Sequence, residues 1–403
     1  MKRRKFIHTL NAGMAATLVS KSAIANTLFS SSNNRSLQEE LAYHTIKSIT
    51  FDDVRMQYPR LVGKNARLDI HGYGPRLAIC ILTTDQGARG WASLRGGRRE
   101  ASRIVPDLIG KKLSDVFDVT IGITDDRYLP FDIALHDLAG VALNKPVYAI
   151  LGRSTPYLTK YYSGMIYFDD LEPSHAPGGI DKILEECRYD YEYGYRQFKL
   201  KIGRGHRWMP YKEGLTRDIE VTKAVAAAFP DCDILVDGNN GFTVNEFIAY
   251  LKGIGDIPLF WIEEPFHETV KDYRILKDWM QSAGVSSLLA DGEADPDPAL
   301  LDELMQQKLM DVHLSDIEGL GFTNWRKLMP QLVQYGVQAS PHAWGSLLKT
   351  YYTAHLAGGL GNTVTVEGVT STSEDVDLSK YTIKDGKLIP PDAPGFGIDL
   401  LSM

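Results

Sequence analysis

Short apolar runs alternate with longer amphipathic stretches along the chain between about residues 157 and 370. The runs are four to six residues long, as in buried strands, and the stretches between them have helical spacing. The strands predicted in this way are 197–202, 233–236, 259–262, 287–290, 311–314, 337–340 and 363–366. Strands that alternate with helices predict an α/β fold with a parallel sheet.

The pattern differs before and after this region. Between about residues 44 and 150 there are β-type runs at 46–51 and 77–83, followed by a helical stretch at 132–151, which indicates a small α+β unit. Near the end, Asp385-Gly386 is typical of a hairpin turn and precedes Pro390-Pro391. This segment predicts a tail that returns to the first unit.

The N-terminus has the order of an export signal. Arg3-Arg4-Lys5-Phe6-Ile7 resembles a twin-arginine motif, a weakly apolar stretch follows, and Ala23-Ile24-Ala25 fits a cleavage site. A serine-rich linker comes next. We therefore predict four segments: a signal and linker at 1–35, an α+β capping domain at 36–155, a catalytic barrel domain at 156–375 and a C-terminal tail at 376–403.

Composition narrows the class of protein. With 403 residues, 44% of them hydrophobic and 24% charged, the chain is typical of folded globular proteins, which argues against disordered, collagenous and membrane-spanning classes. The net charge is −7, and it becomes −12 without the five positive charges of residues 1–25, so we expect no nucleic-acid partner. Three widely spaced cysteines predict buried thiols rather than a disulfide framework.

A charged or polar residue ends or follows almost every predicted strand, at intervals of 23 to 36 residues. These residues are Lys201, Asp237, Glu263, Glu293, Asp316, His342 and Glu367. The interval fits one strand-loop-helix unit of a barrel of about 250 residues, in which the carboxyl ends of the strands meet at one mouth. We therefore expect these seven side chains to share one site.

Three of them suit a hard cation. Asp237, Glu263 and Glu293 offer only oxygen ligands, which favours Mg²⁺ over Zn²⁺, with Mn²⁺ equally acceptable. Without a cation, three clustered carboxylates would repel one another. Asp291 is the alternative to Glu293 as the third ligand.

The remaining residues suit acid–base chemistry. Lys199 and Lys201 are two apart, so they project from the same face of a strand, and a neighbouring cation should lower the pKa of a lysine enough to make it a general base. Asp316 would orient His342 as the opposing group. Glu367 would either donate to an oxyanion, if protonated, or hydrogen-bond the substrate.

Together these groups indicate removal of a proton next to a carboxylate. The cation and Lys199 would neutralise the enediolate, while Lys201 and His342 would flank it. An acid on the opposite face gives epimerisation, whereas protonation of a β-hydroxyl group gives dehydration. The residues alone allow both reactions.

The motifs resemble the enolase superfamily, specifically its mandelate racemase subgroup, over about residues 44–403. The matching segments are Phe198-Lys199-Leu200-Lys201, Val236-Asp237-Gly238-Asn239, Trp261-Ile262-Glu263-Glu264-Pro265, Ala290-Asp291-Gly292-Glu293 and Pro341-His342-Ala343-Trp344. The resemblance implies a modified TIM barrel, (β/α)7β, with an α+β capping domain built from both chain ends, one Mg²⁺, and dimers or octamers. Asn239 and Trp344 are candidate substrate contacts.

Two features depart from this pattern. The export signal is unusual for the family, and the basic, aromatic segment 203–209 is either an ordinary loop or a contact to an anionic substrate. We predict a Mg²⁺-dependent acid-sugar dehydratase that is exported by the twin-arginine route, or cytoplasmic if the signal is not used. The alternatives are a racemase, epimerase or cycloisomerase and, more remotely, a non-catalytic periplasmic sugar-acid binder.

Overall fold

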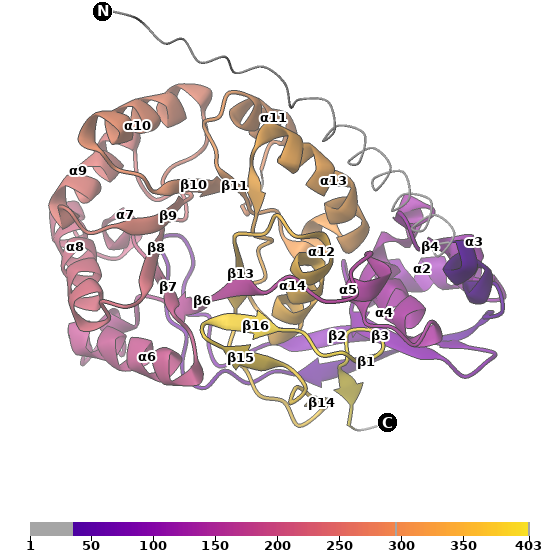
Figure 1. Cartoon of the computed structure of the whole chain (residues 1–403). Coiled ribbons are helices and arrows are strands. Elements are labelled where there is room, and N and C mark those ends of the chain that lie inside the picture. The colour runs from indigo at the N-terminus through magenta and orange to yellow at the C-terminus, as the bar shows by residue number, and fades with distance from the viewer. Residues whose placement is uncertain (1–34, 295, 402–403) are drawn as a thin grey trace, which may run out of the picture.

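The computed structural model describes residues 35–294 and 296–401, so the predicted signal segment and most of the linker lie outside the described residues. In the larger part, an outer ring of helices surrounds an inner ring of strands (Figure 1). A smaller α+β part lies beside them. The predicted α/β class is confirmed.

Eight parallel strands form the inner layer. They are β6 (Thr159–Ile166), β7 (Gln197–Lys201), β8 (Asp233–Asp237), β9 (Leu259–Glu263), β10 (Leu288–Asp291), β11 (Val312–His313), β12 (Gln338–Ala339) and β13 (Thr365–Gly368). Each pairs in parallel with the next from β6 to β12, and β13 pairs in parallel with β6. A parallel bridge between Ala339 and Thr363 joins β12 to the start of β13, which closes the ring.

Seven longer helices connect the eight strands and form the outer ring (Figure 1). They are α6 (Gly179–Tyr193), α8 (Tyr211–Ala228), α9 (Val244–Ile254), α10 (Val270–Ala283), α11 (Pro298–Gln306), α13 (Phe322–Tyr335) and α14 (Leu347–Leu360). Several begin at side-chain caps; for example, the Thr243 hydroxyl accepts from the backbone N–H of Glu246 at the start of α9. Eight strands with seven connecting helices confirm the (β/α)7β prediction.

One barrel strand was missing from the seven predicted by pattern. The first, β6, has the sequence Thr-Lys-Tyr-Tyr-Ser-Gly-Met-Ile and therefore lacks a continuous apolar run in its first six residues. Its side chains are nevertheless almost all buried, because one face packs into the barrel and the other against the outer helices. Hydroxyl-bearing side chains at buried positions concealed the strand from a hydropathy pattern.

The α+β part begins with the antiparallel strands β1 (Ile46–Arg55), β2 (Arg76–Thr84) and β3 (Arg89–Ser93). Its helices are α2 (Arg98–Leu108), α3 (Leu113–Val116), α4 (Asp132–Ala142) and α5 (Val147–Ile150), with the short elements η1 (Asp126–Phe131), β4 (Phe117–Asp118) and β5 (Gly122–Ile123). The single helical stretch predicted at 132–151 was wrong, because Asn144 adopts a positive φ of 49° and Pro146 follows it, which ends α4 before α5 begins.

The C-terminal segment contacts both parts. The strands β15 (Thr382–Lys384) and β16 (Lys387–Ile389) form a hairpin through Asp385 and Gly386, both with positive φ, and β16 adds to β6 in antiparallel fashion. Further on, β17 (Asp399–Leu400) pairs with β14 (Val376–Asp377). The backbone N–H of Phe396 donates to Asp137 of α4 at 2.7 Å, which holds the chain end against the α+β part.

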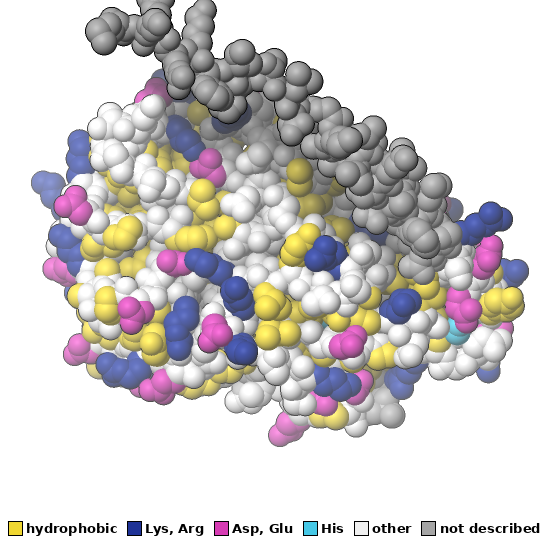
Figure 2. Space-filling view, viewed as in Figure 1, with side chains coloured by type: hydrophobic (Ala, Val, Ile, Leu, Met, Phe, Trp, Pro, Cys, Tyr) yellow, Lys and Arg dark blue, Asp and Glu magenta, His cyan; other side chains and the backbone are white. Residues whose placement is uncertain are grey.

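Positive and negative side chains are interspersed on the face shown in Figure 2, over both the outer helices and the C-terminal hairpin. Among the described helices, none combines the length and the apolar character needed to cross a membrane.

Candidate active site

Strand alternation aims the polar residues into the barrel. In β7, Phe198 and Leu200 pack into the main core beneath the helices, so Lys199 and Lys201 point to the opposite, inner face, as predicted. The inner space at the level below is filled by a separate apolar cluster of Tyr162, Leu235, Trp261, Ala290, Val312 and Leu314. The polar residues therefore stand above an apolar plug at the carboxyl ends of the strands.

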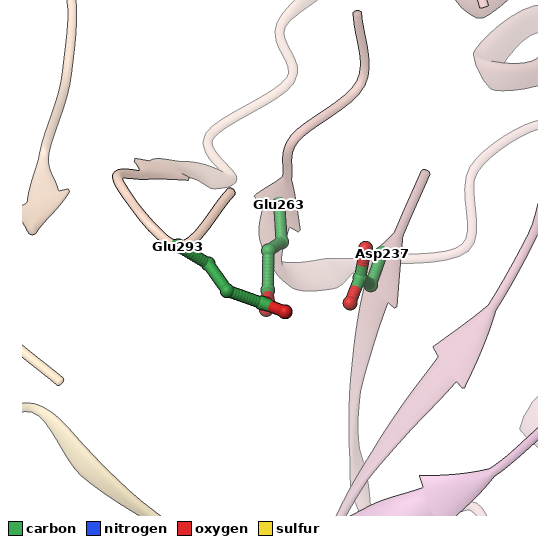
Figure 3. A group of neighbouring side chains, drawn as sticks. All are labelled: Asp237, Glu263 and Glu293. Carbon is green, nitrogen blue, oxygen red and sulfur yellow. The ribbon is translucent and has the colours of Figure 1, made fainter. Parts of the chain in front are cut away.

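Asp237, Glu263 and Glu293 converge at this end. They come from the ends of β8 and β9 and from the loop after β10, and their carboxylate groups face a common space (Figure 3). One oxygen from each lies within 4.8 Å of the others, and Asp237 and Glu263 are fully buried. Glu263 Oε2 and Glu293 Oε2 are buried without a hydrogen-bond partner. Unpartnered carboxylate oxygens in an all-oxygen donor set fit a hard divalent cation.

Asp291 lies outside this group. It follows Ala290, an inward-facing residue of β10, and therefore points outward, where Tyr273 of α10 donates a hydrogen bond to its Oδ2. Gly292 then adopts a positive φ of 114°, and this turn returns the chain so that Glu293 faces the interior. Of the two candidates for the third ligand, the structure brings Glu293 to Asp237 and Glu263.

The two lysines are paired with the same carboxylates. Lys199 Nζ lies 2.8 Å from Glu263 Oε1 and 2.9 Å from Glu367 Oε1, while Lys201 Nζ contacts Asp237 Oδ2. Burial alone would lower the pKa of Lys199, but the charges of Glu263 and Glu367 outweigh it and raise this pKa well above its usual value. Burial also lowers the pKa of Lys201, but the charge of Asp237 outweighs it, so this pKa is raised as well.

The expected lowering of the lysine pKa is therefore opposite to what these pairs produce. The reason is that the expectation counted the neighbouring ammonium and a cation, whereas each ammonium here lies against at least one buried carboxylate. Burial and Asp237 also raise the pKa of Glu263 well above its ordinary value. Lys199, Lys201 and Glu263 therefore each hold a proton more tightly than the free side chain does.

His342 faces the carboxylates from the opposite side. Its Nδ1 lies 2.9 Å from Asp316 Oδ2, and its Nε2 lies 3.1 Å from Glu293 Oε1. Burial lowers the pKa of His342, but Glu293, Glu367 and the hydrogen bond to Asp316 raise it to about 10. With Nδ1 directed to Asp316, Nε2 is the ring atom available for proton transfer.

Glu367 bridges the two sides of the site. Its Oε1 pairs with Lys199, and its Oε2 accepts the backbone N–H of Ala343 at 2.8 Å. Burial favours the neutral acid, but Lys199 and His342 lower the pKa of Glu367. Of its two expected roles, the structure favours an ionised carboxylate that accepts hydrogen bonds.

The two candidate substrate contacts lie at this mouth. Asn239 follows Asp237 with a positive φ of 43°, and its buried Oδ1 has no hydrogen-bond partner. Trp344 packs against Tyr167 at 4.9 Å between ring centroids and against His71, from the capping loop between β1 and β2, at 5.8 Å. These rings form an aromatic wall beside His342.

The segment 203–209 belongs to the connection between β7 and α8 and contains the short helix α7 (Arg204–Arg207). The buried guanidinium of Arg204 pairs with Asp170 and Asp218, and Trp208 Nε1 donates to the backbone oxygen of Asn65 in the capping loop at 2.6 Å. Arg207 donates to the backbone oxygen of Arg67. These contacts fasten the capping loop to the barrel.

Pattern reading missed four residues near the site. The rings of Tyr162 and Tyr167 lie 5.3 and 5.2 Å from the Nζ atoms of Lys199 and Lys201. Tyr162 belongs to β6, so strand alternation would have identified it had that strand been recognised, whereas Tyr167 follows the end of β6. Lys349, which comes seven residues after His342, contacts Asp316, and no sequence motif marks it. His71 lies in a loop and has no sequence signal.

Comparison with known proteins now gives the family. Residues 182–402 match the model described as "Enolase C-terminal domain-like", more than half of the chain. The chain belongs to the enolase superfamily. This membership confirms the resemblance drawn from the five motifs.

Superfamily members of known structure share the whole fold. A galacturonate dehydratase from Geobacillus sp., solved with D-galacturonate and 5-keto-4-deoxy-D-galacturonate, is 32% identical, with a TM-score of 0.82 over 89% of this chain and 95% of its own. A mandelate racemase/muconate lactonizing protein from Geobacillus sp. Y412MC10, solved with magnesium and tartrate, is 31% identical, with a TM-score of 0.84 over 90% and 94%. The D-xylonate dehydratase of Haloferax volcanii is 23% identical over 90% of this chain and 94% of its own. Dehydratases of acid sugars are thus among the relatives.

Proposed function

We propose that the protein is a Mg²⁺-dependent dehydratase of an acid sugar, with a uronate as its substrate. The observation that carries this proposal is that Lys201 and His342 lie on either side of the three clustered carboxylates. Lys201 contacts Asp237, and His342 contacts Glu293. This arrangement places a base and an acid around a single substrate carboxylate.

The group formed by Asp237, Glu263 and Glu293 would hold the cation. When bound, the cation would neutralise the substrate carboxylate and the charge that develops on it. It would also offset the negative charge of the carboxylates that raises the pKa values of the lysines. The three carboxyl side chains, with two oxygens lacking partners, provide such a site.

The chain's own residues would then move two protons. Lys201 Nζ takes the proton from the carbon next to the carboxylate, and the C–H electrons pass into the carboxylate to give the enediolate. His342 Nε2 then gives its proton to the β-hydroxyl, which departs as water while the electrons of the enediolate form the C–C double bond. The resulting enol tautomerises to a keto acid, so no external oxidant or reductant is needed. Lys199, paired with Glu367, supplies positive charge to the enediolate.

A uronate fits this chemistry and the similarity to the galacturonate dehydratase. In D-galacturonate, carbon 5 carries the acidic proton next to the carboxylate and carbon 4 carries a hydroxyl. Loss of water across that bond gives the 5-keto-4-deoxy acid named in the relative's complex. The aromatic wall of Trp344, Tyr167 and His71 offers an apolar surface to the C–H face of a sugar.

A substrate panel tests the proposal. The mature protein with Mg²⁺ should convert one or a few uronates to keto acids, measured by semicarbazone absorbance, with hexonates and aldarates in the same plate. His342→Asn should remove the signal, because the variant lacks the acid for the leaving hydroxyl, by about 10²–10⁴-fold. Turnover of aldarates alone would overturn the uronate assignment, and epimers without keto acid would replace dehydration by isomerisation.

We also propose that this activity is exported from the cytoplasm. The support is the twin-arginine segment at residues 3–7, which lies outside the described residues. Changing Arg3 and Arg4 to lysine should keep the charge and leave the protein in the cytoplasmic fraction, as followed by immunoblot of cell fractions. Equal distribution of the wild type and this variant would contradict export by that route.

A further inference from the structure

The carboxylate of Asp316 is held by more partners than His342 alone. Its Oδ1 accepts the backbone N–H groups of Glu318 and Gly319 at 2.9 and 2.7 Å, as the N-cap of α12 (Ile317–Leu320). Its Oδ2 accepts from His342 Nδ1 and also from Lys349 Nζ. All four donors are fixed to the protein, so the carboxylate has one orientation.

Lys349 makes two contacts on the His342 side of the site. It lies in the first turn of α14, and its side chain is 13% exposed. In addition to Asp316, its Nζ donates to the backbone oxygen of Trp344 at 3.1 Å. One ammonium group therefore ties the residue that orients His342 to the loop that carries His342.

The same ammonium is linked to the capping domain. Glu318, whose charge raises the pKa of Lys349, accepts a hydrogen bond from Ser93 at the end of β3. Burial raises the pKa of Glu318, and the positive charge of Lys349 is the largest effect that opposes this rise. Lys349 thus lies between a buried carboxyl at the domain boundary and the Asp316–His342 pair.

We propose that Lys349 is a positioning residue for the leaving-group step: it fixes Asp316 and the Trp344 backbone together so that His342 Nε2 is held at the β-hydroxyl. This inference rests on the proposed dehydration. It acts on one step only, because Lys201, which removes the first proton, lies on β7 and pairs with Asp237, whereas Lys349 holds Asp316 and the backbone of Trp344.

The separation of the two steps provides the test. Lys349→Met keeps the length of the side chain and removes the charge, Lys349→Arg keeps the charge and the donors, and Lys327→Met is a matched control on the outer helix α13. In D₂O with a uronate, proton NMR gives both the rate of dehydration and the rate at which deuterium enters the recovered substrate at the carbon next to the carboxylate.

We expect Lys349→Met to lower kcat by about 10–100-fold, as loss of an outer partner of a ligating or catalytic histidine does, with KM within about threefold. The ratio of deuterium exchange to dehydration should rise at least about tenfold, because the enediolate returns to substrate when protonation of the hydroxyl is slow. Lys349→Arg should recover most of kcat, and Lys327→Met should match the wild type. An unchanged kcat, or a fall of exchange in proportion to dehydration, would overturn the proposal.

A readout without substrate separates this inference from the proposed function. The Nδ1 proton of His342, identified by its loss in His342→Asn, should give a sharp hydrogen-bonded NMR signal in the wild type, Lys349→Arg and Lys327→Met. It should broaden or shift in Lys349→Met while the melting temperature confirms folding. If the wild type turns over no acid, the dehydratase proposal fails, and an unchanged signal in Lys349→Met would overturn the positioning role by itself.

Discussion

Replacing Lys201 by methionine is expected to abolish both dehydration and deuterium exchange, with a loss of about 10³–10⁴-fold in each. Methionine keeps the volume of the buried side chain but has no atom that accepts a proton. Because exchange requires removal of the proton next to the carboxylate, both rates must fall together. Proton NMR in D₂O measures them in one sample.

His342→Asn gives the contrasting result. It should lose dehydration but retain exchange, since Lys201 is intact and only the acid for the hydroxyl is missing. Lys160→Met is a matched control, because Lys160 lies on the barrel strand β6 but is half exposed and pairs with Asp233 away from the site. Exchange that persists in Lys201→Met and disappears in His342→Asn would reverse the two roles.

Removal of divalent cations is expected to have the second largest effect. Chelation should lower turnover at least about 100-fold, because the developing charge loses its main stabilisation, and Mg²⁺ should restore it. The cation should also raise the free energy of unfolding, by about 2.7 kcal/mol at a concentration 100 times its dissociation constant. Chemical denaturation with EDTA or with Mg²⁺ measures this difference.

The stabilisation by Mg²⁺ should depend on pH. Burial and the charge of Asp237 raise the pKa of Glu263 in the folded protein, so the cation-free fold binds a proton that the unfolded chain does not. Its free energy of unfolding therefore falls as the pH rises from the ordinary glutamate pKa toward the raised one. Mg²⁺ replaces that proton, so the gain from Mg²⁺ should be larger at about pH 8 than at about pH 5.5.

Glu263→Gln tests the origin of this dependence. Glutamine does not titrate, so the variant lacks the loss of stability that a raised glutamate pKa causes at high pH. It should therefore be more stable than the wild type in EDTA at about pH 8 and should gain much less from Mg²⁺. Glu303→Gln, at an exposed position on α11, serves as the control. A full Mg²⁺ effect in Glu263→Gln would contradict the assignment of Glu263 as a ligand.

Strand alternation explains how much of the site could be predicted from the sequence. A residue that ends a barrel strand in phase with its inward neighbours must face the mouth, which is why Lys199, Lys201, Asp237 and Glu263 are found together. The same rule separates Asp291 from Glu293 only when the left-handed turn at Gly292 is known. Tertiary structure supplied that turn.

Other parts depend on contacts that no local pattern carries. The strand β6 escaped notice because tyrosine, serine and glycine occupy buried positions in it. Lys349 reaches Asp316 from a different helix, and His71 reaches Trp344 from the capping domain, so both depend on long-range packing. The directions of the lysine pKa shifts likewise required the distances to Glu263, Glu367 and Asp237.

The most direct test of the central claim is a proton NMR spectrum of the purified protein with D-galacturonate and Mg²⁺ in D₂O. The account predicts that the signals of the substrate protons on carbons 4 and 5 disappear and that the signals of a 4-deoxy-5-keto product appear. Samples with EDTA or with Lys201→Met should stay unchanged. Conversion that continues in EDTA, or a panel of uronates that shows neither product nor deuterium exchange, would contradict it.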